Sequence, residues 1–122
     1  MTIGFVMLCH TALDRAAEVA RHWATRDCPV VIHVDRRVER AKYDGLVKSL
    51  ADLSNIRFSG RHACEWGTWG IVAATQEAST IMLREFAAVR HVYLASGSCL
   101  PLRPAEDLIS YLNDRPRTDF IE

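Results

Sequence analysis

The 122-residue sequence lacks the motifs of several common ligand-binding classes. No GxGxxG follows its first apolar run, where Cys9-His10-Thr11 stands instead, so a nicotinamide or flavin dinucleotide site is not indicated. No GxxxxGK[ST] is present, which argues against a P-loop. The four cysteines are scattered and form no CxxC pair, and no basic segment typical of a signal peptide precedes the first apolar run. These absences favour reduced thiols and a cytoplasmic location.

The chain also lacks an excess of either charge and any long hydrophobic segment. Fifteen basic and fifteen acidic residues give a formal net charge of zero, which argues against nucleic acid as the main partner. No apolar run approaches the length of a membrane span, so we expect no transmembrane segment and at most a peripheral membrane association. Hydrophobic residues make up 49% of the chain, as in one ordinary globular domain.

What is present is an alternation of strand-like and helix-like segments. Apolar runs of strand length occupy residues 3–9, 30–34, 55–58, 91–96 and 118–121. Amphipathic patterns of helical spacing lie between them, at residues 13–24, 43–53, 67–88 and 104–112. This order predicts an α/β fold with three layers, a Rossmann-like and mostly parallel sheet, and right-handed crossovers.

Local signals refine this expectation at three positions. Thr11 is placed to cap the first helix, with Asp14 three residues later as in a capping box. The β-branched run 30–34 is continuous, as in a strand buried on both faces. The helix at 67–88 is apolar over much of its circumference, so we expect it to be buried.

The stretch that ends the fourth predicted strand is the first candidate site. The apolar run 92–95 stops at Ser96-Gly97-Ser98, a turn of small residues that leaves N–H groups and hydroxyls free for a ligand. In open α/β sheets ligands bind at the carboxyl ends of the strands. The turn contains no Asp or Glu, so it offers no carboxylate for a metal ion.

The second predicted strand ends in a histidine and an aspartate, His33 and Asp35. A carboxylate at such a strand end can bind a ribose or the edge of a base. A structural alternative is that Asp35 caps a helix or forms a salt bridge with Arg36 or Arg37. For His33 the alternative is a core histidine whose ring nitrogens have partners within the protein.

Residues 61–70, RHACEWGTWG, place two tryptophans and two glycines at the entrance to a helix. Trp66 and Trp69 are three residues apart and would share one side of a helical turn. Their rings can stack on bases or sugars, or they can instead be core aromatics that hold the helix against the sheet. Glu65 beside them is either a general base or a solvated residue.

Two neighbouring cysteine and histidine pairs suggest thiol or metal chemistry. Cys64 lies near His62, and Cys9 is followed by His10. Neither pair has the ligand spacing of a zinc site. Adjacent side chains of a strand also point to opposite faces, which argues against a direct contact within the second pair.

Taken together, four blocks of the chain resemble one family. In order they read VMLCHTALDRAAEVARHW, VVIHVDRR, WGTWGIVAATQEA, and VYLASGSCLPLRPAEDLISYL followed by FIE. The chain in this respect resembles the core-2/I-branching β-1,6-N-acetylglucosaminyltransferases, a family that includes the peptide O-xylosyltransferases. The blocks occur in family order and span nearly the whole chain. The resemblance implies the N-terminal, nucleotide-sugar-binding half of a GT-A-type glycosyltransferase fold, extending over residues 1–122.

The resemblance also implies roles for individual residues. Asp35 would contact the uracil of a UDP-sugar, and His10 would lie beside the nucleotide. Trp66 would pack on the uridine, and the Ser96–Ser98 turn would line the sugar and pyrophosphate region. Glu122 would hold the acceptor sugar. No catalytic residue and no cofactor is expected within these residues.

The implied reaction is an inverting transfer of an N-acetylglucosamine- or xylose-type sugar from UDP to a glycan, lipid-linked or other hydroxyl acceptor. Many family members have an aspartate where this chain has Cys99, so any role of that carboxylate is absent. Because the turn offers no carboxylate, we expect transfer without a metal ion. The family's catalytic base and the cations that neutralise the diphosphate come from later sequence.

We therefore expect the chain, which stops inside the predicted strand at 118–121, to be truncated at its C-terminal end and inactive alone. Two alternative functions remain at this stage. One is a non-catalytic nucleotide-binding or scaffold domain in polysaccharide synthesis, and the other is a flavodoxin-like signalling module. UDP binding separates the transferase from the flavodoxin-like module.

Overall fold

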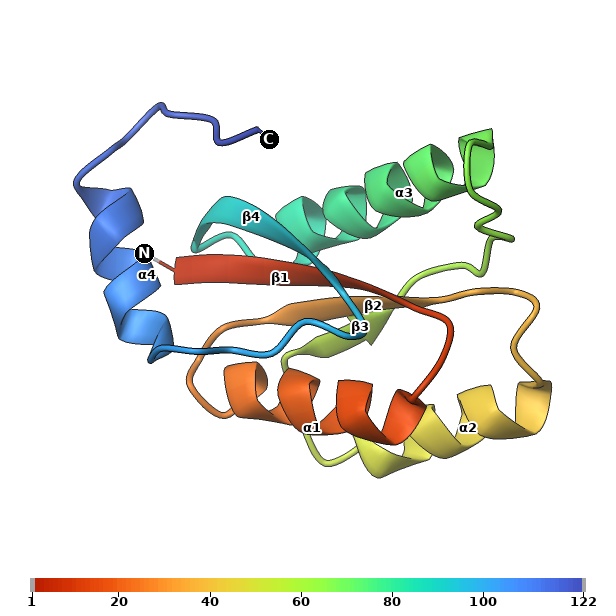
Figure 1. The fold of residues 1–122 in the computed structure, drawn as a ribbon. Helices are drawn as coiled ribbons and strands as arrows, with labels where there is room; N and C mark the ends of the chain where they lie inside the picture. The colour runs from red at the N-terminus through yellow and green to blue at the C-terminus, as the bar shows by residue number, and fades with distance from the viewer. Residues whose placement is uncertain (1, 122) are drawn as a thin grey trace.

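The computed structural model describes residues 2–121. Strands and helices alternate along the chain, as the sequence pattern predicts (Figure 1). They are β1 (Thr2–Cys9), α1 (Leu13–Ala24), β2 (Val30–Val34), α2 (Arg40–Ser49), β3 (Ile56–Phe58), α3 (Trp69–Glu85), β4 (Val89–Ser96) and α4 (Ala105–Asn113).

The four strands form one parallel sheet in the order β3-β2-β1-β4. Helices α1 and α2 cover one face and α3 covers the other, so the predicted three-layer Rossmann-like α/β fold is confirmed (Figure 1). The chain builds outward from β1 to β3 and then returns to place β4 on the other side of β1. This reversal puts a topological switch point between β1 and β4, where doubly wound sheets bind ligands.

Alternation of side chains along β1 divides the core between the two faces. Ile3, Phe5 and Met7 point toward α1, where the Phe5 ring stacks on Trp23 with ring centroids 3.8 Å apart. Val6 points to the opposite face and packs in the smaller cluster under α3. Strand β2 is buried along its whole length, as its continuous apolar run predicts.

The predicted cap of α1 is wrong. The N-cap residue is Ala12, with φ 47° in the left-handed region, and no side chain caps the helix. Ala12 therefore stands between Thr11 and the first helical residue, Leu13, in place of a capping side chain. Asp14 remains in the first turn, where a negative charge is favourable.

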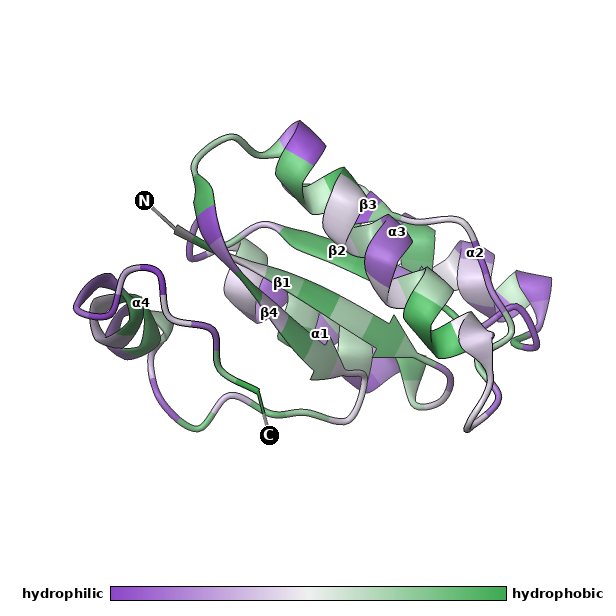
Figure 2. Ribbon diagram, turned by 90° about the horizontal axis from the view of Figure 1, so that it is seen from above, coloured by the Kyte–Doolittle hydropathy of each residue, from purple (hydrophilic) through white to green (hydrophobic). Residues whose placement is uncertain are grey.

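Helix α3 is shorter and more exposed than its composition suggests. Only Ala74, Ala78 and Met82 are buried, while Val72 and Leu83 are exposed. The helix packs one side against the sheet and leaves the other side uncovered, and Figure 2 shows hydrophobic and hydrophilic residues alternating along it. The expectation of a helix buried around its circumference is therefore wrong for the described residues.

The strand predicted at 118–121 does not form. Within residues 2–121 this segment makes no backbone hydrogen bond to a strand and has an extended, irregular path. An alternating pattern alone does not make a strand, because the backbone also needs a neighbouring edge with which to pair. Glu122, predicted to hold an acceptor sugar, lies outside the described residues. Over the described part of the chain, no helix is long and apolar enough to span a membrane.

Candidate functional site

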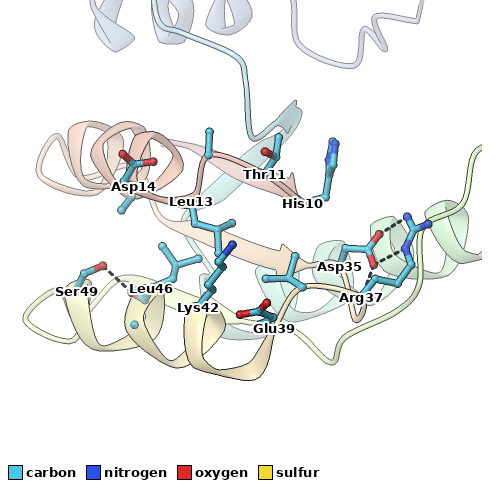
Figure 3. A pocket seen from close by; sticks show the side chains of 14 residues that line it. His10, Thr11, Leu13, Asp14, Asp35, Arg37, Glu39, Lys42, Leu46 and Ser49 are labelled. Atoms are coloured by element: carbon cyan, nitrogen blue, oxygen red, sulfur yellow. Dashed lines mark hydrogen bonds and ion pairs between the residues drawn. The ribbon is translucent and has the colours of Figure 1, made fainter.

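A cleft of about 1080 Å³ opens between α1 and α2 at the carboxyl edge of the sheet. His10 at the end of β1 and Asp35 at the end of β2 both line it, although 25 positions separate them in the sequence (Figure 3). Parallel strands place their carboxyl ends at one edge, which explains why these two predicted nucleotide-binding residues line the same cleft. The remaining wall comes from α1, from α2 and from the segment between β2 and α2.

Asp35 is 2% exposed, and its carboxylate has four hydrogen-bond donors. Oδ1 accepts from the Arg37 N–H at 2.8 Å and from Arg37 Nε at 3.0 Å. Oδ2 accepts from Arg37 Nη2 at 2.8 Å and from the Cys64 N–H at 3.1 Å. The Arg37 guanidinium is the main reason that the pKa of Asp35 lies far below its ordinary value. Of the two salt bridges considered from the sequence, the one with Arg37 is present.

This pairing changes what the cleft presents to a ligand. The four donors occupy the lone-pair sites of the Asp35 carboxylate, so a ligand that bonds to it must replace one of them. The Arg37 side chain is 54% exposed and lines the cleft. Its Nη1 has no hydrogen-bond partner among residues 2–121, which leaves a cationic donor at the cleft wall.

Trp66 lies in the loop between β3 and α3 and does not line the cleft. It is 95% exposed, and Trp69 is 68% exposed, so the alternative that they are core aromatics is wrong for both. The loop is nevertheless joined to the cleft, because the Cys64 N–H bonds to Asp35 and Arg37 Nη2 donates to the Cys64 carbonyl at 3.2 Å. Trp66 follows Cys64 by two residues.

The turn after β4 packs against the end of β1. The Gly97 N–H donates to the Leu8 carbonyl at 2.8 Å, and a Cβ on Gly97 would lie 3.2 Å from Cys9 Cα. Ser96 and Ser98 are exposed, with their hydroxyl oxygens 3.0 Å apart, and the Ser98 N–H donates to Ser96 Oγ at 3.3 Å. The expectation that the N–H groups of this turn are free is therefore wrong for Gly97 and Ser98. The carboxyl ends of β2, β1 and β4 therefore carry Asp35, His10 and this turn, in that order along one edge.

Comparison with protein families places this chain in a known family. The family model described as "Branch: Core-2/I-Branching enzyme" matches residues 3–122. This chain belongs to the core-2/I-branching enzyme family. A search of curated proteins finds no match. Members of this family are glycosyltransferases, which confirms the resemblance drawn from the four sequence blocks.

In this core-2/I-branching domain the cysteine chemistry considered from the sequence is not favoured. Burial raises the pKa of the Cys9 thiol to about 12 and also raises that of Cys64. The thiolate is the nucleophilic form, so a raised pKa disfavours both groups as nucleophiles. Cys64 Sγ lies 4.0 Å from His33 Nδ1, and its contact with His62 is to the backbone carbonyl, at 3.7 Å. Glu65, considered as a general base, is exposed. No group of three or more potential ligands among the described residues is arranged to hold a metal ion.

Sequence reasoning missed Arg61 as a residue that shapes the site of this branching-enzyme domain. Its guanidinium donates to the carbonyls of Val34, Asp35 and Val38, at 3.4, 2.8 and 2.6 Å. It also lies over the Tyr43 ring, 4.6 Å from the centroid. These contacts join the β3–α3 loop to the segment after β2. They span 18 to 27 sequence positions, so no local pattern signals them.

Proposed function

We propose that this domain binds the donor of an inverting glycosyltransferase, which moves an N-acetylglucosamine- or xylose-type sugar from UDP to a hydroxyl of a glycan or lipid-linked acceptor. One observation carries the proposal. In a core-2/I-branching chain, His10 and the paired Asp35 and Arg37 line a single cleft at the carboxyl edge of the sheet. This is the edge at which α/β folds bind nucleotides.

The proposed donor pose places the uracil at the Asp35–Arg37 pair, where Arg37 Nη1 donates to a uracil carbonyl oxygen and the uracil N3–H replaces one of the four donors on Asp35. Trp66 would pack on the uridine from the adjoining loop, because its indole is exposed and available for stacking. His10 would lie beside the nucleotide. Ser96, Gly97 and Ser98 would border the sugar and the diphosphate, whose negative charge the uncapped N-terminus of α1 also favours.

The proposed reaction is a single displacement. A carboxylate base takes the proton of the acceptor hydroxyl, its oxygen bonds to the anomeric carbon with inversion, and UDP leaves with the bonding electron pair. The charge that builds on the diphosphate must be neutralised. The Ser96–Ser98 turn has no carboxylate to hold a metal ion, so we propose that basic side chains outside these 122 residues do this. The domain alone would then bind donor without transferring sugar, on the cytoplasmic side or at a membrane periphery.

Titration of the 122-residue chain with UDP in a calorimeter tests the proposal. We expect saturable binding with a dissociation constant of about 1 mM or tighter, corresponding to about 4 kcal/mol. Adding EDTA should change this affinity by less than about two-fold, or about 0.4 kcal/mol. CDP and ADP serve as controls and should bind more weakly, because their bases present a different edge to the Asp35–Arg37 pair. Absence of UDP binding would overturn the donor site, and binding that requires manganese would overturn the metal-independent mechanism.

A further inference from the structure

A second cluster of titratable side chains lies behind the site, on the α3 face of the sheet. His33 of β2 is 1% exposed, and its ring lies 5.7 Å from that of His62 in the β3–α3 loop. Cys64 of the same loop and Glu77 of α3 complete the cluster. None of these side chains lines the cleft, so the proposed donor site makes no direct use of them.

The hydrogen bonding at His33 fixes its proton. The His62 backbone N–H donates to His33 Nε2 at 2.8 Å. A backbone N–H can only donate, so Nε2 must be the unprotonated nitrogen and the proton must be on Nδ1. Nδ1 faces Cys64 Sγ at 4.0 Å. The loop is therefore held by a neutral imidazole, and a second proton on the ring would remove the acceptor.

The surrounding groups keep His33 neutral. Burial is the main cause that lowers the pKa of His33, and the neighbouring His62 and Arg61 act in the same direction. Asp35 just after β2 and Glu77 on α3 oppose them, because a negative charge favours the protonated ring. The net effect is a pKa of His33 below the ordinary value of 6.5, so the ring is neutral at neutral pH.

Glu77 ties the same loop to α3. Its Oε2 pairs with His62 Nε2, and its Oε1 accepts the Gly60 N–H at 2.9 Å. The loop is thus held to α3 at two points and to β2 through His33. Two residues further on, β2 holds it again, because Asp35 accepts the Cys64 N–H. His33 in β2 and Asp35 just after it therefore each accept a backbone N–H of the same loop.

We propose that neutral His33 is a positioning residue, which holds residues 62–66 against β2 so that Cys64 supports Asp35 and Trp66 meets the nucleotide. Protonation of His33 releases the His62 N–H, loosens the loop and weakens donor binding. The proposal rests on the proposed donor site. It makes a prediction about the ligand-free loop as well, which does not depend on that site.

Two substitutions separate the role of His33 as a hydrogen-bond acceptor from its ability to take up a proton. In His33→Gln the side-chain Oε1 can replace Nε2 as the acceptor of the His62 N–H, but it does not titrate between pH 4 and pH 8. In His33→Leu the acceptor is lost and the N–H is left unpaired in a buried place. His91→Gln is the matched control, because His91 is also a strand histidine, on β4, which β1 separates from β2 in the sheet.

UDP affinity is measured by calorimetry from about pH 7.5 to about pH 4.5, with folding checked by circular dichroism at each pH. For the unsubstituted chain we expect the affinity to fall toward the acid end of this range, by at most about ten-fold per pH unit as for one linked proton. His33→Gln should keep its neutral-pH affinity and show less than half of this loss on a logarithmic scale. The dependence of UDP affinity on pH in His33→Gln also shows how much of the loss comes from protonation of UDP itself. His91→Gln should follow the unsubstituted chain.

Two results would overturn the positioning role: an equal pH profile in His33→Gln, or unchanged neutral-pH affinity in His33→Leu. Amide hydrogen exchange of residues 62–66 without ligand provides the independent readout. It should speed up at about pH 4.5, relative to the intrinsic exchange rate, in the unsubstituted chain and not in His33→Gln. If no UDP binding occurs at any pH, the donor site is wrong, and the exchange rates alone decide whether His33 holds the loop.

Discussion

Replacing Asp35 with alanine should both destabilise the fold and abolish UDP binding. The substitution leaves the backbone N–H groups of Arg37 and Cys64 without their acceptor beside a buried strand end. Both hydrogen bonds are partly buried, so each lost acceptor should cost near the lower end of the range of about 1–3 kcal/mol typical of a buried donor, and we expect a loss of about 2 kcal/mol for the two. Urea denaturation measures the loss of stability. Calorimetric titration without urea, on protein shown to be folded, measures the loss of UDP binding.

The control for this substitution is Asp52→Ala. Asp52 also forms an ion pair with an arginine, Arg21, at 2.7 Å, but its side chain is 62% exposed. Surface ion pairs contribute little, so this variant should unfold close to the unsubstituted chain and bind UDP equally well. Equal denaturation midpoints for the two variants would show that the contacts of Asp35 do not support the fold.

The low pKa of Asp35 gives this contribution a pH dependence. The folded-state pKa lies below the ordinary value of 3.8, so the stability it adds is fully present above that value. It is lost as the pH falls through the folded-state pKa. The free energy of unfolding of Asp35→Ala should therefore lie below that of the unsubstituted chain above about pH 4. The difference between the two should shrink in stronger acid.

Replacing Gly70 with alanine should have the second large effect, through a clash rather than a lost bond. A Cβ at this position would lie 2.0 Å from the carbonyl oxygen of Ala63 and 3.0 Å from its carbonyl carbon. Both are backbone atoms of the loop that carries Cys64 and Trp66, so the loop must move. We expect a loss of about 3 kcal/mol in urea denaturation, at the upper end for an overpacked site. UDP affinity should fall by at least about ten-fold, or 1.4 kcal/mol, because the displaced loop no longer supports Asp35.

Gly45→Ala is the matched control for folding stability. Gly45 also lies in a helix, α2, but a Cβ there would meet nothing within 4 Å. Alanine is the better helix former by about 1 kcal/mol, so this variant should be slightly more stable than the unsubstituted chain. A similar loss of stability in both glycine variants would contradict the assigned close contact between α3 and the loop.

Much of the fold follows from the sequence, because parallel strands buried on both faces have a distinctive pattern. The β-branched run of β2 and the alternation of apolar runs with helical spacing predict the sheet and its layers. The bounds of α1 were predicted, but its cap was not, since the N-cap residue is the left-handed Ala12 rather than Thr11. Residues 118–121 have a strand-like pattern, but a strand also requires a partner edge, which the pattern does not specify.

The candidate site was predictable only where it depends on topology. His10, Asp35 and the Ser96–Ser98 turn follow predicted strands, and parallel strands must place them at one edge. Side-chain partners were not predictable. The Asp35 carboxylate is shared between a neighbour, Arg37, and the distant Cys64, and local sequence specifies only the first. The position of the loop that carries Trp66 likewise depends on contacts between residues distant in sequence, such as those of Arg61 and Cys64 with Asp35.

Mapping the UDP contacts by amide and indole chemical shifts tests the central claim most directly. The account predicts shifts on saturation at His10, at residues 35–37 and at the Trp66 indole, with smaller changes along the 96–98 turn. The second, smaller cavity, lined by residues such as His91, Asn113 and Arg117, provides the internal comparison and should not respond. Shifts confined to that cavity, or no shifts with UDP above its expected dissociation constant, would contradict a donor site at the carboxyl edge of the sheet.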